Sequence, residues 1–321
     1  MTEYEKLVIR TWLLQDAKPL PLAIRLTTGL TGRIKGVLRT AAWAKGPRAT
    51  QFFERLRSAA REAIIRTLEQ AATAQQLERV ERELRTLGSQ ADTATAIRML
   101  PLQVKDETAR RLAKTQTVHV ATEGAVAGLV TSVCELAPGL QGFVVPALIA
   151  DMTATMYMMA QSAVQIGYSY GYSLHTPDDL PHFLVAMAPH TDEASLLDAK
   201  LTAHLALRES GILAARAVGE HLTVRMLSAN NMAFSKLIDT VASRMALYLA
   251  EKELGFLLPI AGAVLQGSVN AAFAHASYLR AARYFQRLHF IDRYGEEYLE
   301  TQLLLLRGVL REGPAASANA G

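Results

Sequence analysis

Apolar positions recur at helical spacing along most of the chain. Residues 3–16 form a short amphipathic pattern that stops at Lys18-Pro19-Leu20-Pro21, because two closely spaced prolines cannot continue a helix. Between 52 and 87 the apolar residues follow a 3-4-3 spacing with glutamate and arginine between them, at Leu77, Val80, Leu84 and Leu87. This spacing predicts a long helical region with one buried face.

Further helices are predicted toward the C-terminus. Asp92-Thr93 can cap a helix that runs to about Met99, and the helical pattern resumes at Gln103. The remaining predicted helices cover 193–210, 211–229, 231–255 and a last segment that ends near Arg311. No stretch alternates apolar and polar residues for long enough to predict a strand. The sequence therefore predicts an all-α, multi-helix globular bundle.

Small residues characterise the central part of the chain. From Thr117 the composition shifts toward Ala, Gly, Val and Met. Small side chains then recur at every fourth position, in the sets Ala163, Gly167, Gly171 and Ala263, Gly267, Ala271. Because such a stripe lets the backbone of another helix approach, we expect Gly/Ala-rich, closely packed core helices. The chain divides into a basic and amphipathic N-terminal region (1–92), a helical core (93–311) and a disordered tail (312–321).

Two apolar stretches are long enough to span a bilayer. The first, 136–177, contains Asp151 as its sole charged residue, and the second, 254–279, contains no Asp, Glu, Lys or Arg. Both also contain proline and glutamine, which favours helices buried in protein. Insertion of these stretches into a bilayer remains an open alternative.

The charge of the chain is placed unevenly. Half of the 321 residues are hydrophobic and 20% are charged, a composition that excludes a disordered chain. The net charge is +4, but the segment 17–53 holds seven basic residues and no acidic ones, so the rest of the chain carries −3. The seven basic residues are Lys18, Arg25, Arg33, Lys35, Arg39, Lys45 and Arg48.

This basic segment is typical of proteins that bind anionic surfaces. Anionic lipid attracts each nearby lysine or arginine by about 1 kcal/mol, and a tryptophan commonly lies at the headgroup level. The residues expected to bind the membrane or another anion are Arg33, Lys35, Arg39, Trp43, Lys45 and Arg48. Nucleic acid is a less favoured partner, because no reading motif accompanies the charge. A solvated or acid-paired structural face is the remaining alternative.

The single cysteine and the N-terminus both bear on the compartment. Cys134 has no second cysteine with which to form an internal disulfide, as is usual in reducing compartments. The sequence begins with acidic residues rather than the basic and then apolar pattern of a secretory signal. We therefore expect a cytoplasmic protein on the inner face of the cell membrane.

Several polar residues of the core could carry chemistry. Asp151 needs a partner, a proton or water, because an unpaired buried carboxylate is costly. Its expected partner is one of Arg280, Arg283 and Arg287, which share a helix face, or His275. Asn270 should form a hydrogen bond if it is buried. A lipid-derived substrate could bind among Asp151, Tyr170 and Asn270 if the protein were an enzyme.

Motifs for metals, nucleophiles and nucleotides are weak. His119 and Glu123 share a helix face and could combine with Glu135 and Asp151, but no Glu-x-x-His or His-Glu-x-x-His pattern supports a metal centre. Residues 167–171 satisfy Gly-x-Ser-x-Gly, yet that nucleophile elbow requires a strand before its helix. A triad would need Asp178 or Asp179 with His190. Neither glycine-rich nucleotide motif occurs, so we expect no cofactor.

The order of several core segments resembles the EcsC protein family of bacteria, over roughly residues 95 to 290. The resemblance is carried by the segments 121–128, 146–151, 170–172, 258–263, 269–273 and 281–285. Cys134-Glu135 departs from the pattern, where a glycine and apolar residues would be expected. The resemblance implies membrane association and a link to an ABC transporter, which would be a possible partner, and it implies no settled biochemical activity.

These observations together favour a non-enzymatic role. We expect a peripheral membrane-associated protein that interacts with lipid or serves a transporter, and whose basic N-terminal region docks on an anionic membrane. The alternative is a hydrolase or a metal-dependent enzyme that acts on a lipid-derived substrate in the helical core. A carboxylate with a displaced pKa or a bound metal in a lined cavity would favour the enzyme.

Overall fold

A computed structural model describes residues 1–17, 47–71, 74–114, 144–189, 194–209, 224–254 and 262–311. All regular elements in these ranges are helices, which confirms the predicted all-α fold. Their bounds are α1 (Glu3–Ala17), α3 (Pro47–Ala71), α4 (Ala74–Thr86), α5 (Ala94–Met99), a helix over 102–114, α7 (Val144–Ser169), η3 (Pro177–Asp179), α8 (Leu180–Met187), α9 (Ala194–Glu209), α11 (Val224–Asn230), α12 (Met232–Leu254), α13 (Gly262–Tyr294) and α14 (Glu296–Arg311).

Local sequence signals account for several of the helix ends. Thr93 caps α5 as predicted, because its hydroxyl accepts a hydrogen bond from the backbone N–H of Ala96 at 3.2 Å. α7 ends at Ser169, and Gly171 in the turn that follows has a φ of +80° and lies against the backbone of Ala94 and Arg98. A side chain at Gly171 would be strained and would also collide with α5. The glycine therefore lets α5 pack across the end of α7.

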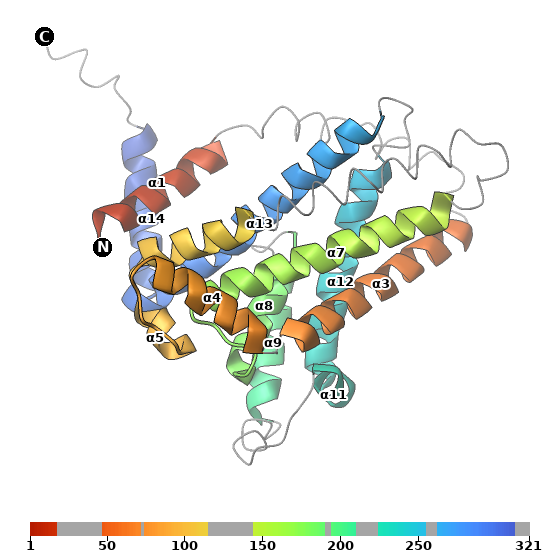
Figure 1. Cartoon of the computed structure of the whole chain (residues 1–321), viewed down its shortest axis with the longest axis horizontal. Coiled ribbons are helices and arrows are strands. Elements are labelled where there is room, and N and C mark those ends of the chain that lie inside the picture. Colours follow the sequence, from red (N-terminus) through yellow and green to blue (C-terminus); the bar gives the residue numbers. More distant parts are fainter. Residues whose placement is uncertain are drawn as a thin grey trace, which may run out of the picture.

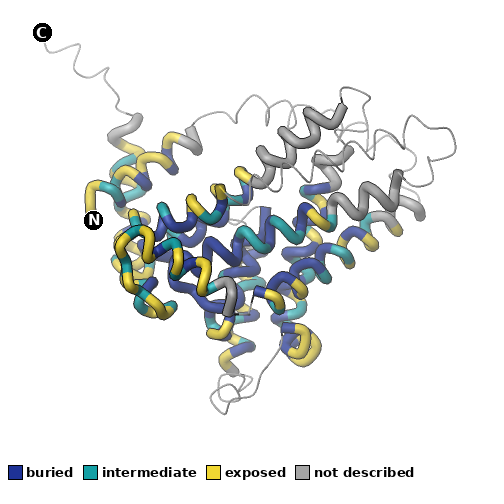
Figure 2. Tube along the Cα trace, viewed as in Figure 1, coloured by how far each residue is buried: buried dark blue, intermediate teal, exposed yellow. Residues whose placement is uncertain are grey.

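The described helices share one apolar core. α7 runs through the middle of the molecule and packs against α3 and α13, while α12 packs against α3 and α9 (Figure 1). The short helix α8 lies among α7, α9, α12 and α13, and most of its residues are buried (Figure 2). Because α8 is surrounded on several sides, it is apolar nearly all round, as expected for an interior helix.

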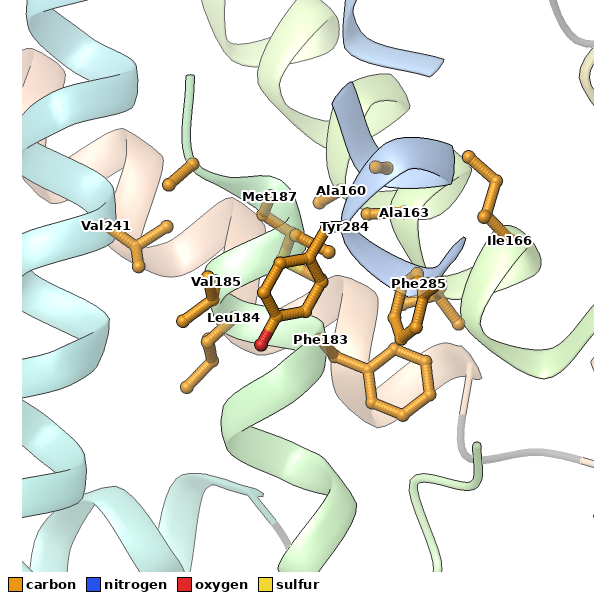
Figure 3. Packing of buried hydrophobic residues seen from close by; sticks show 14 of the residues in the cluster. Ala160, Ala163, Ile166, Phe183, Leu184, Val185, Met187, Val241, Tyr284 and Phe285 are labelled. Atoms are coloured by element: carbon orange, nitrogen blue, oxygen red, sulfur yellow. The ribbon is translucent and has the colours of Figure 1, made fainter. Parts of the chain in front are cut away.

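Close packing at small residues is confirmed where the side chains are described. Ala160 and Ala163 are buried on α7 and face α8 and α13 (Figure 3). A Cβ atom added at Gly167 would overlap the rings of Phe183 and Phe285. The rings of α8 and α13 thus rest directly on the backbone of α7. The second predicted set, Ala263 to Ala271, lies in the part of α13 whose side chains are not described.

The boundaries follow the sequence closely in most of the chain. α1, α9 and α12 begin and end within two residues of the predicted bounds, and α14 ends at Arg311. The predicted helical region over 52–87 starts earlier, at Pro47, since proline is well tolerated in the first turn of a helix. Of the predicted helix 211–229, the described part begins at Val224. The tail 312–321 lies outside the described residues.

None of the described helices combines the length and apolarity required to cross a bilayer. The stretches 136–177 and 254–279 lie partly outside the described residues.

Candidate functional site

Most of the predicted membrane-binding residues lie outside the described part of the chain. Arg33, Lys35, Arg39, Trp43 and Lys45 fall in the range 18–46, and Arg48 lies in α3 without a described side chain. The helices around this segment are nevertheless placed. α3, α7 and α13 begin, and α12 ends, at one end of the molecule (Figure 1). We call this the loop end and define it by Pro47, Val144, Leu254 and Gly262.

The predicted partners of Asp151 have other neighbours. Arg280 donates to the Tyr248 hydroxyl at 3.1 Å and to the Ser277 hydroxyl at 3.0 Å. Arg283 lies over the Trp12 ring at 5.6 Å, and Arg287 pairs with Glu300 at 2.8 Å.

His275 stacks on Tyr278, with their ring centroids 6.2 Å apart. The side chains of Asp151 and Asn270, on α7 and α13, are not described, and Glu123 lies outside the described residues. The pairing of Asp151 therefore stays a prediction.

The Gly-x-Ser-x-Gly motif forms the end of a helix, as its all-α context predicts. Ser169 is fully buried and donates to the backbone carbonyl of Gln165 at 2.9 Å. Asp179 accepts two hydrogen bonds from Arg98 at 3.0 and 2.9 Å, and Asp178 pairs with Arg208. His190 lies outside the described residues. This serine is therefore not presented to a substrate, unlike the exposed serine of a nucleophile elbow.

A metal site within the described ranges would need several His, Cys, Asp or Glu side chains close together. No group of three or more His, Cys, Asp or Glu side chains within those ranges could hold a metal ion. His119, Glu123 and Glu135 fall outside them.

The structure places Tyr170 in a buried network around Asp106. This network, which we call the Asp106 network, consists of Tyr4, Trp12, Asp106, Tyr170 and Gln286. The carboxylate of Asp106 accepts hydrogen bonds from the hydroxyl of Tyr4 at 2.8 Å, from the hydroxyl of Tyr170 and from the amide of Gln286 at 3.0 Å. Gln286 in turn accepts a hydrogen bond from the indole N–H of Trp12 at 2.8 Å. The network joins α1, the helix 102–114, the turn that follows α7, and α13.

A second buried chain begins at the neighbouring residue, Lys105. Its ammonium donates to the backbone carbonyl of Arg98 at 2.5 Å and lies 3.0 Å from Nδ1 of His289. Nε2 of His289 lies 3.4 Å from Glu5, which also accepts from the Tyr294 hydroxyl at 2.9 Å. Each polar group in this Lys105 chain has a partner.

Burial sets the pKa values in these two clusters. It lowers the pKa of Lys105 to about 8 and that of His289 to about 4, because each charged form loses hydration. Burial also raises the pKa of Asp106, although three hydrogen-bond donors oppose that change. Hydrogen bonds from Thr2, Tyr294 and His289 lower the pKa of Glu5 against the effect of burial.

A third polar cluster lies where α8, α9 and α13 meet. This α9 cluster consists of His182, Lys200, His204 and Tyr284. Nδ1 of His182 lies 3.0 Å from the Tyr284 hydroxyl, and the rings of His182 and His204 have centroids 6.3 Å apart. The Lys200 ammonium lies 5.6 Å from the centroid of the Tyr284 ring. Figure 3 shows Tyr284 lying against Leu184 and Val185 of α8.

Burial also dominates the titration of the α9 cluster. It lowers the pKa of Lys200 to about 8 and that of His182 to about 2, with the charge of Lys200 adding to the effect on His182. The pKa of His204 is lowered for the same reason, against the opposing field of Asp178. At neutral pH the two imidazoles are therefore neutral and Lys200 is the main cation of the cluster.

Sequence reasoning did not single out Lys105, Asp106 or the α9 cluster. Lys200 and His204 are four positions apart in the sequence and so share a face of α9. Such a pair is common on helices that face solvent. Lys105 and Asp106 lie in a stretch with further charged residues, which resembles an exposed face. A sequence signal for the α9 cluster is the helical spacing of Leu196, Ala203 and Leu207 beside Lys200 and His204, and the structure shows that these three apolar residues are buried.

Comparisons with known proteins add no identity to this geometry. No protein-family model, no curated protein and no solved structure matches the chain.

Proposed function

We propose that this protein is a peripheral membrane-associated protein that interacts with anionic lipid at the inner face of a cell membrane. The observation that carries the proposal is the placement of charge. The segment 17–53 holds seven basic residues and no acidic ones, whereas the remaining residues sum to −3. Because anionic lipid attracts clustered basic residues and repels acidic surfaces, this distribution would orient the protein on a bilayer.

The position of the loop end supports this orientation. The basic segment enters the described fold at Pro47, where α3 begins. α7 and α13 begin at the same end with apolar residues, Val144-Val145 and Gly262-Ala263-Val264-Leu265 (Figure 1). A combination of basic and apolar sequence at one end of a protein suits an interface between water and lipid. We propose that the loop end faces the membrane.

The resemblance to the EcsC family extends the proposal to a transporter-accessory role. That family is regarded as membrane-associated and is linked to an ABC transporter, which agrees with the charge placement. The enzyme alternative has less support among the described residues, because the one serine in a nucleophile motif is buried and bonded to its own helix.

Co-sedimentation with liposomes tests the proposal. The vesicles contain either phosphatidylcholine alone or phosphatidylcholine with phosphatidylglycerol, at low and high salt. We expect binding only to the anionic vesicles, and weaker binding at high salt because salt screens the charges. A variant with Arg33, Lys35, Arg39, Lys45 and Arg48 replaced by Gln should bind at least about tenfold more weakly, since each basic residue contributes about 1 kcal/mol.

A matched variant controls for total charge. It replaces five exposed arginines that are distant from the loop end, namely Arg79, Arg82, Arg85, Arg110 and Arg111. We expect this variant to bind as the natural protein does. Equal binding by the first variant and the natural protein, or equal loss in both variants, would contradict the proposal.

A further inference from the structure

The α9 cluster contains a half-buried ammonium, on Lys200, and a buried ring nitrogen, on His204, that lack the usual polar partners among the described residues. The Lys200 ammonium has no hydrogen bond or carboxylate within ion-pair distance among the described residues, and it lies 5.6 Å from the centroid of the Tyr284 ring. Nδ1 of His204 is fully buried and has no hydrogen-bond partner among the described residues. Folding proteins normally satisfy such groups, because a buried unpaired donor or charge is costly.

The carboxylates around the cluster are engaged elsewhere. Asp178 accepts two hydrogen bonds from Arg208, at 3.2 and 3.1 Å. Asp292 accepts from the Tyr172 hydroxyl at 2.9 Å, and Glu296 faces Arg287 at 3.5 Å. Asp179 is bonded to Arg98 and to the backbone N–H of Ser173. These arrangements leave the positive charge of Lys200 without a dedicated counter-ion from the described chain.

His204 is poised to act together with Lys200. Its Nε2 atom lies 3.6 Å from a carboxylate oxygen of Asp178, while Nδ1 lies on the opposite edge of the ring. An anion beside Nδ1 would favour a doubly protonated ring, with Nε2–H directed at Asp178 and Nδ1–H at the anion. Lys200 and His204 are one helical turn apart on α9, so both groups can reach one ligand.

Apolar residues lie beside the two groups on the same helix. Leu197 and Leu201 precede Lys200 and His204 by three residues each, which makes them neighbours on the surface of α9. Leu197 is 44% exposed and Leu201 is 59% exposed. Lys200 and His204 are suited to bind an anionic group, and the exposed leucines beside them are suited to contact an apolar chain. A ligand with an anionic head and an apolar tail would satisfy both.

We propose that Lys200 and His204 bind the oxyanion of an amphiphilic ligand, a phosphate or carboxylate group whose apolar chain lies along Leu197 and Leu201. Tyr284 and His182 form the inner wall of the site and hold Lys200 at the junction of α8, α9 and α13. This site is separate from the loop end, and it does not depend on the proposed membrane orientation.

Titration calorimetry with hexyl phosphate and inorganic phosphate tests the site. We expect the natural protein to bind hexyl phosphate saturably and inorganic phosphate more weakly, because phosphate alone lacks the apolar chain. Lys200→Met should weaken the binding of hexyl phosphate at least tenfold, and His204→Gln should weaken it by a smaller factor. Lys200→Arg keeps the charge and should retain most of the binding.

Two controls separate the site from general electrostatics and from misfolding. Lys236→Met removes an exposed lysine from α12 and should leave binding unchanged. The thermal unfolding midpoint of Lys200→Met should match that of the natural protein, which would show that the loss of binding is local. Absence of saturable binding to the natural protein, or equal binding by Lys200→Met, would overturn the proposal. Equal affinity for phosphate and hexyl phosphate would overturn the assignment of the apolar chain.

Anionic vesicles distinguish a soluble ligand from a bilayer headgroup. We expect Lys200→Met to bind phosphatidylglycerol vesicles as the natural protein does, since the loop end carries that interaction. Weaker vesicle binding by Lys200→Met together with weaker binding of hexyl phosphate would support the oxyanion site and assign its ligand to the bilayer. Loss of vesicle binding in the basic-segment variant, with hexyl phosphate binding retained, would show that the two surfaces act independently.

Discussion

Burial lowers the pKa of two lysines of this protein to a similar value, but the two side chains have different neighbours. Burial lowers the pKa of both Lys105 and Lys200 to about 8. Lys105 is 1% exposed and has a carbonyl and an imidazole nitrogen as partners. Lys200 has an aromatic ring and no acceptor among the described residues. A lowered pKa is therefore common to a structural lysine and to a candidate ligand-binding lysine. The absence of a hydrogen-bond acceptor among the described residues is what distinguishes Lys200 as the candidate.

The region around Lys105 and Asp106 acts in the docking of the N-terminal helix. Tyr4, Glu5 and Trp12 all belong to α1, and each contributes a hydrogen bond to this region. Because the groups are mutually satisfied and enclosed, they stabilise one position of α1 against α13 and the helix 102–114. The α9 cluster is partly open to solvent and is incomplete. The first region is therefore structural, and the second is a candidate for ligand binding.

The largest expected effect is that of Asp106→Ala. The substitution removes the carboxylate that accepts hydrogen bonds from Tyr4, Tyr170 and Gln286, so these three donors would lose their acceptor. We expect the free energy of unfolding to decrease by about 3 to 5 kcal/mol. Urea denaturation followed by circular dichroism measures the change. Asp198→Ala removes an exposed carboxylate on α9 and should change stability by less than about 0.5 kcal/mol. Similar values for the two variants would show that the Asp106 network is not a stabilising contact.

The paired substitutions Lys105→Met and Lys200→Met test the comparison directly. Lys105→Met deprives the Arg98 carbonyl and His289 of a donor, and we expect it to destabilise the protein by about 2 kcal/mol. Lys200→Met removes a charge that has no counter-ion in the described chain, so its effect should lie within about 0.5 kcal/mol or be stabilising. The same urea experiment measures both. Equal destabilisation would remove the distinction between the two lysines.

The third expected effect depends on pH and is a change in the slope of stability against pH. The pKa of His289 is lowered from its ordinary value of 6.5 to about 4 in the folded protein. The unfolded chain therefore binds more protons between these values, and stability decreases as the pH falls from 6.5 to 4. His289→Gln should reduce this decrease by at most about 1.4 kcal/mol per pH unit. Urea midpoints at intervals across this range measure the slope, and parallel curves for the two proteins would refute the assignment.

Local patterns predicted much of the architecture. The 3-4-3 spacing in 77–87, the Thr93 cap and the glycines at 167 and 171 all correspond to features of the described fold. These features depend on residues within one or two helical turns, so they can be read without knowing the tertiary contacts. The chain also shows the placement of its charge, from which the membrane proposal follows.

The candidate site could not be predicted in the same way. Sequence reasoning considered Tyr170 for a substrate site, but the structure places it on Asp106, 64 residues away in the chain. The pairing of Asp151 with one of the α13 arginines or His275 stays a prediction, while Arg280 contacts Tyr248 and Arg283 contacts Trp12. Each of these contacts depends on how helices cross, and amphipathic spacing leaves that crossing undetermined.

The sequence by itself determined an all-α protein with small-residue packing on α7 and a basic segment at 17–53. The tertiary structure alone decided which buried polar groups have hydrogen-bond partners and which groups lack them among the described residues. Lys105 contacts His289, which is 184 residues away in the chain, and Trp12 donates a hydrogen bond to Gln286, which is 274 residues away. The physical reason is that helix periodicity depends on residues close together in the chain. The burial of a charged group and the position of its hydrogen-bond partner depend on helices that are distant in the chain.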